Sequence, residues 1–107
     1  MKTENALLTE IIEACFDLSM HGQVPPEQRA DFLALGKRLR GTLVNLLTAE
    51  FIEGTAAVSE ANRKISELNQ ALKQEAKALA NIANTVEQIG QLVSTLDGLL
   101  KLAVGFK

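Results

Sequence analysis

The longest hydrophobic pattern in the chain occupies its C-terminal half. From Val58 to Ala103, apolar residues recur at alternating intervals of three and four, which is the heptad repeat of helices that pack together. Of the fourteen a and d positions in these seven heptads, Glu75 is the one that is not apolar. The pattern predicts a long helix with one packing face. We expect this face to form an oligomer or packing interface, made by Val58, Ile65, Leu68, Leu72, Leu79, Ile82, Val86, Ile89, Val93, Leu96 and Leu100.

The same heptad register continues upstream of Val58, where its positions are at first apolar and then charged. Extending the heptads backwards places Val44 at a and Leu47 at d, so the register is kept across Gly54. This continuity favours a single helix from about residue 26 to 103, and the alternative is a turn near Gly54 that gives a three-helix antiparallel bundle. Further upstream, Lys37 and Arg40 fall on the packing face. The helix is therefore expected to bend or to change partner near residues 39–43.

A shorter amphipathic pattern predicts a first helix over residues 4–20. It is followed by "HGQVPP", in which Gly22 suits the end of a helix and two prolines follow. A second helix should begin near Pro26, with Phe32, Leu35, Leu39, Leu43, Leu46 and Leu47 as its apolar stripe. We expect one all-α domain over 1–107, elongated as a helical bundle or coiled coil. Its expected parts are helix one (1–21), a turn (22–25), helix two (26–54) and helix three (55–104).

The positions that flank the heptad face are small rather than charged. Ala76, Ala83 and Gly90 occupy e positions, where a parallel two-stranded coiled coil usually carries ion pairs. Small residues allow helices to approach closely. The pattern therefore favours a multi-helix, antiparallel arrangement.

Composition narrows the possible functions. The chain has a net charge of −2, 47% hydrophobic residues and 4% aromatic residues, which is typical of a folded helical protein and not of a polyanion binder. The N-terminal "MKTENALLTEIIEAC" mixes acids with apolar residues, unlike a signal peptide, and no run is apolar enough to span a bilayer. We therefore expect a cytoplasmic protein.

Catalytic chemistry has little support in the sequence. Glu10, Glu13, Asp17 and His21 share one face of helix one and could hold a metal, but this face is opposite the apolar one and is expected to be a solvated acidic surface. Cys15 lies among apolar residues without a base beside it, as a core residue does. We expect no enzyme activity, no cofactor and no metal.

One short stretch of helix two is basic. Arg29, Lys37, Arg38 and Arg40 lie within residues 22–54, where four bases are balanced by four acids. A solvated helical face explains them better than phosphate binding, since no aromatic residues accompany them for stacking.

These observations predict a non-enzymatic, oligomeric interaction module that packs through the heptad face. Its expected partners are other copies of the chain and another helical protein. The alternative is a peripheral protein that coats a membrane or an apolar granule, and a nucleic-acid-binding protein is less favoured. The segment from Leu99 to Lys107 is open to contact with either lipid or protein.

Overall fold

The regular secondary structure of the described residues is helical. The computed structural model describes residues 2–51 and 56–103, and within these ranges there are five α-helices and no strand. They are α1 (Asn5–Ser19), α2 (Pro26–Thr48), α3 (Ala56–Lys73), α4 (Glu75–Ala80) and α5 (Ile82–Leu100). The expected all-α class is confirmed.

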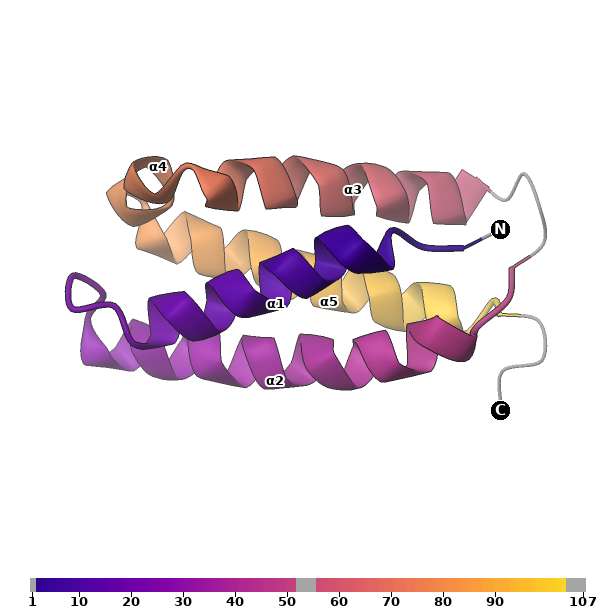
Figure 1. The fold of residues 1–107 in the computed structure, drawn as a ribbon, viewed down its shortest axis with the longest axis horizontal. Helices are drawn as coiled ribbons and strands as arrows, with labels where there is room; N and C mark the ends of the chain where they lie inside the picture. Colours follow the sequence, from indigo (N-terminus) through magenta and orange to yellow (C-terminus); the bar gives the residue numbers. More distant parts are fainter. Residues whose placement is uncertain (1, 52–55, 104–107) are drawn as a thin grey trace.

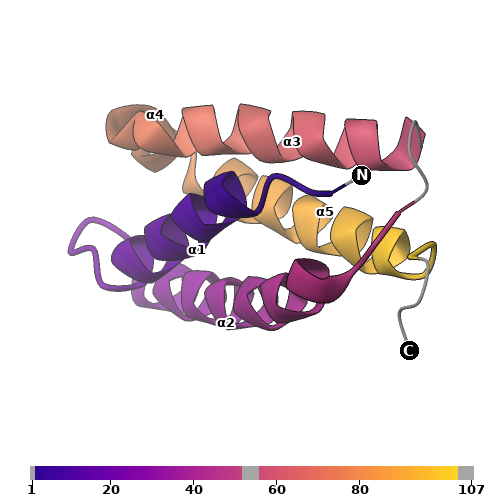
Figure 2. The same ribbon diagram turned by 45° about the vertical axis from the view of Figure 1, so that its right-hand side comes forward.

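The helices form two antiparallel hairpins that pack against each other (Figure 1). The first hairpin is α1 and α2, and the second is α3 and α5, with the short α4 at the bend between them. Helix α1 contacts α2 and α3, while α5 contacts α2 and α3, so α1 and α5 lie on one diagonal of the bundle. Figure 2 shows the same arrangement from a second side. The bundle measures 42 × 22 × 19 Å.

The structure does not confirm a single helix from 26 to 103. Helix α2 ends at Thr48, and Ala49 adopts an extended backbone with a ψ of 138°. Ala49 and Phe51 are nonetheless buried, with 1% and 5% of their surfaces exposed. A continuous helix would span about 110 Å and leave its apolar face in water, so folding back is favoured by burial of that face. Gly54, where the alternative prediction placed a turn, lies outside the described residues.

The expected third helix, residues 55–104, is also divided. Gln74 and Asn81 leave helical geometry on either side of α4. The side chain of Asn81 accepts a hydrogen bond from the Asn84 N–H at 3.2 Å, which caps the start of α5. The Thr85 hydroxyl shares its one proton between the carbonyls of Ala78 and Asn81, both at 3.1 Å, and so ties α4 to α5. These bonds supply partners for backbone N–H and carbonyl groups at the point where the chain turns back from α3 to α5.

Most residues of the heptad face are buried in the core between the two hairpins. Val58, Ile65, Ile89 and Leu96 are fully buried, and Leu68, Val93 and Leu100 are nearly so. Leu72, Leu79, Ile82 and Val86 are partly buried and pack against the same core. The first hairpin contributes Leu8, Ile11, Cys15, Phe32, Leu39 and Leu46. The two halves of one heptad pattern are therefore covered within a single chain.

The first hairpin is tightly packed around a glycine. A Cβ atom added at Gly36 would lie 3.0 Å from Cε1 of Phe16 and 3.1 Å from Cβ of Cys15. The guanidinium of Arg40 lies over the Phe16 ring, 5.6 Å from its centroid. Gly36 thus lets α1 and α2 approach closely and fixes which side of α2 faces α1.

Candidate interaction surface

Helix α2 carries two neighbouring stripes with the same spacing of four and three residues. The inward stripe consists of Phe32, Gly36, Leu39, Leu43 and Leu46, which are buried or partly buried. The outward stripe consists of Leu33, Lys37, Arg40, Val44 and Leu47, all of which are exposed. Each outward residue follows an inward residue directly, so the two stripes are about 100° apart around the helix. The outward stripe is the upstream continuation of the heptad register.

The apolar members of the outward stripe are unusually exposed. Val44 is 61% exposed, Leu47 54% and Leu33 39%. Single exposed apolar residues are common on folded proteins, but these three share one face of α2, with Val44 and Leu47 adjacent near its C-terminal end and Leu33 about three turns before Val44. In the described residues, the other large apolar side chains with comparable exposure are Met20 and Leu102. Three of these five exposed apolar side chains therefore lie on the outward stripe.

The middle of the outward stripe is positively charged. Neither Lys37 nor Arg40 has an ion pair or hydrogen bond within residues 2–51 and 56–103, although Arg40 stacks on Phe16. Their neighbour Arg38 faces the other way and pairs with Asp97 of α5 at 2.6 Å. Two cations without acidic partners thus lie between apolar ends.

The charges explain why α2 buries its inward stripe. Turning the outward stripe into the core would bury Lys37 and Arg40 without partners, which costs several kcal/mol for each ion. The inward stripe has no charged residue, and Gly36 gives it room for α1. The fourth base of the predicted basic stretch, Arg29, is partly buried in the first turn of α2.

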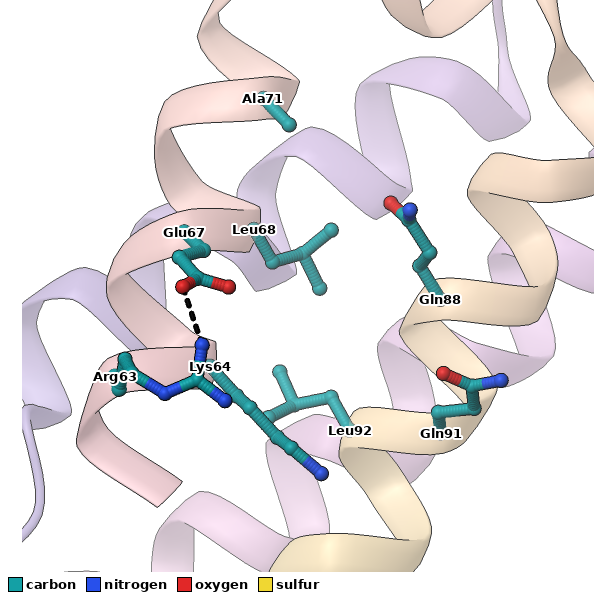
Figure 3. A pocket seen from close by; sticks show the side chains of 8 residues that line it. All are labelled: Arg63, Lys64, Glu67, Leu68, Ala71, Gln88, Gln91 and Leu92. Atoms are coloured by element: carbon teal, nitrogen blue, oxygen red, sulfur yellow. Dashed lines mark hydrogen bonds and ion pairs between the residues drawn. The ribbon is translucent and has the colours of Figure 1, made fainter. Parts of the chain in front are cut away.

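A groove between α3 and α5 is a second open feature (Figure 3). It has a volume of about 290 Å³, and Leu68 and Leu92 lie at its base. Gln88 and Gln91 line it from α5, while the Arg63 guanidinium on the α3 side is ion-paired with Glu67. Leu68 and Leu92 are only 7% and 2% exposed. Filling the groove would therefore bury little additional apolar surface from either leucine.

Two residues of the acidic face predicted for helix one, Glu10 and His21, contact other helices of the bundle. Lys73 of α3 lies 3.2 Å from the Glu10 carboxylate, and the buried Asn69 amide donates to Glu10 at 3.4 Å. The hydrogen bond from Lys73 lowers the pKa of Glu10. His21 Nε2 contacts Glu75 at 2.6 Å, so the residue that interrupts the heptads joins α4 to the end of α1.

The remaining residues of this acidic face, which were considered as metal ligands and interpreted as a solvated surface, do not converge with a third ligand in the described residues. Glu13 and Asp17 line a shallow pocket with Glu10, and within the described ranges no three metal-ligating side chains come together. Cys15 is fully buried, and burial raises the pKa of its thiol to about 12. At neutral pH this thiol is protonated and shielded, which does not suit a nucleophile.

The predicted interface residues and the exposed surface are different sets. The structure brings the heptad residues from Val58 to Leu100 together in or against the core of the chain itself. The sequence placed Val44, Leu47, Lys37 and Arg40 in the heptad register, but it did not predict that this part of the register is exposed. The signal for the stripe was the heptad register upstream of Gly54, which Lys37 and Arg40 obscured.

Comparisons of the chain with protein-family models, with curated proteins and with solved structures find no match. Among the described helices, none combines the length and hydropathy that crossing a bilayer requires.

Proposed function

We propose that the chain is a non-enzymatic interaction module that binds another helix along the outward stripe of α2. The observation that carries this proposal is the heptad spacing of exposed apolar residues, Leu33, Val44 and Leu47. This spacing is the one by which helices pack side by side, and amphipathic helices are recognised through anchors at such intervals.

The exposed area is suited to a reversible contact. Fully burying an aliphatic side chain is worth about 1.5–3 kcal/mol, and the three residues are about half exposed, so the available gain is about 3 kcal/mol. Association has its own entropic cost of several kcal/mol. Binding along this stripe therefore needs further contacts from its basic residues and from the neighbouring surface.

Self-association through the Val58–Leu100 heptads remains a prediction. It concerns different residues from the outward stripe and is difficult to test by substitution. Ile89 and Leu96 are fully buried in the folded chain, so an aspartate at either position would unfold the chain itself. A variant at the outward stripe avoids this problem because its residues contribute little to the core.

The experiment compares affinity capture from the native cells by three versions of the full chain. They are the wild type, the double variant Val44→Asp/Leu47→Asp, and the control Gln70→Asp on an exposed position of α3. We expect a protein that the wild type and the control retain and the double variant loses, while all three keep similar melting temperatures. Identical captured proteins for all three versions would contradict the proposal.

Light scattering behind size exclusion, run on the same three proteins, tests whether the bound helix belongs to a second copy. A dimer that only the double variant loses would support binding at the outward stripe and identify the partner as the chain itself.

A further inference from the structure

We infer that the partner of the outward stripe is an amphipathic helix of a different protein, with acidic residues placed opposite Lys37 and Arg40. This inference rests on the proposed function and specifies the chemistry of the partner. It is carried by the charge of the stripe, which has two cations and no acid among its five residues.

A second copy of α2 is a poor occupant in either orientation. In a parallel pairing, Lys37 would face Lys37 and Arg40 would face Arg40. In an antiparallel pairing that matches Leu33 with Leu47, the residue numbers sum to eighty, so Arg40 again faces Arg40 at the centre. Like charges at the middle of a helix contact oppose association. Repulsion between like charges therefore disfavours pairing of two outward stripes.

An acidic partner helix removes this obstacle. Neither Lys37 nor Arg40 has an acidic partner within the described part of the chain, so both are available for ion pairs across an interface. The stacking of Arg40 on Phe16 restrains its guanidinium beside the stripe, which reduces the ordering needed on binding.

The dimensions set the length of the partner segment. The stripe runs from Leu33 to Leu47, about 21 Å along the helix axis at 1.5 Å per residue. Two apolar residues lie at its C-terminal end and one at its N-terminal end. The matching helix thus has about four turns, with acids in the middle and apolar residues at both ends.

An anionic membrane surface shares part of this chemistry, but the structure favours a helix. Interfacial helices insert a broad apolar face flanked by bases, frequently with Trp, and the chain has no Trp. In α2 the bases lie on the apolar stripe itself, between its ends. This placement matches an ion pair within a helix–helix contact better than insertion into lipid.

The test uses two synthetic stapled helical peptides with leucines at four-three spacing. One peptide has glutamates and the other has lysines at the two central positions. Fluorescence anisotropy measures their binding to the wild type, to Lys37→Glu/Arg40→Glu, and to the control Lys77→Glu/Lys101→Glu, which changes the net charge equally. We expect the glutamate peptide to bind the wild type and the control, and to bind the stripe variant about tenfold more weakly. The lysine peptide should prefer the stripe variant.

Each other outcome overturns the inference in a recognisable way. If both peptides bind the wild type equally and Val44→Asp/Leu47→Asp abolishes both, the proposed function stands and the acidic partner is wrong. If neither peptide binds at about 100 µM, both proposals fail. If neither peptide binds, but phosphatidylglycerol vesicles bind the wild type and release the stripe variant, the stripe is a membrane surface. A dimer that Lys37→Glu/Arg40→Glu disrupts would identify a second copy as the partner.

Discussion

Two adjacent leucines in the last turn of α2 provide a matched test of which stripe the bundle buries. Leu46 is 1% exposed and belongs to the core, whereas Leu47 is 54% exposed on the outward stripe. Leu46→Ala removes buried methyl groups and leaves a cavity, which costs about 3 kcal/mol, with a usual range of about 2–5. Leu47→Ala removes a side chain that is already half exposed, so little buried apolar area is lost and the cost should be under about 1 kcal/mol.

The comparison cancels effects that are common to both positions. Both substitutions are leucine to alanine, one residue apart in the same helical turn, so helix propensity and fraying change nearly equally. For a chain of this size, the Leu46→Ala penalty lowers the melting temperature by about 10–20 °C. Urea unfolding followed by circular dichroism measures both variants. Equal losses, or a larger loss for Leu47→Ala, would refute the assignment of inward and outward stripes.

Three further predictions address packing, burial and charge. Gly36→Val should destabilise the chain by about 2 kcal/mol in urea unfolding, because even a Cβ at this position would be in close contact with α1. Gly41→Ala, with open space around the added Cβ, should instead stabilise the chain by about 0.5–1 kcal/mol. Cys15 should react with iodoacetamide only at the rate at which the chain opens, and fast labelling in native buffer would contradict its burial. Because the hydrogen bond from Lys73 lowers the pKa of Glu10, this carboxylate stabilises the folded chain above its ordinary pKa, and the contribution is lost as the pH falls below about 4. Glu10→Gln should therefore flatten the decline in unfolding free energy between roughly pH 5 and pH 3, and an unchanged slope would count against the pair.

Hydrophobic periodicity identified the helices, and the glycine and prolines of "HGQVPP" located the turn between α1 and α2, but the pattern did not locate the breaks after α2 and between α3 and α5. The residues from Val58 to Leu100 were predicted to share one packing face, and they do lie together in or against the core. The pattern is the same whether a partner is another chain or the same chain folded back. The reversal depends instead on local hydrogen bonds, such as the cap that Asn81 gives to α5, and on Glu75 at the start of α4. Asn81 stands within an otherwise unbroken heptad pattern, so the sequence around it gives only a weak signal for a helix start.

The outward stripe shows a second limit of sequence reasoning. Two stripes with identical spacing lie one residue apart on α2, and periodicity alone does not say which is buried. The choice depends on the unfavourable burial of Lys37 and Arg40 and on the close approach at Gly36, which requires knowing that α1 packs there. The contact of His21 with Glu75 likewise joins residues that are distant in sequence.

Site-specific photocrosslinking in the native cells tests whether the outward stripe of α2 binds a helix of another protein. A photoreactive phenylalanine analogue replaces Val44 in one strain and the exposed Gln70 of α3 in a control strain, and mass spectrometry identifies the crosslinked residues. We expect a defined adduct from position 44, mapping to one face of an acidic amphipathic helix, and no corresponding adduct from position 70. The same adducts from both positions, or none from position 44, would contradict it.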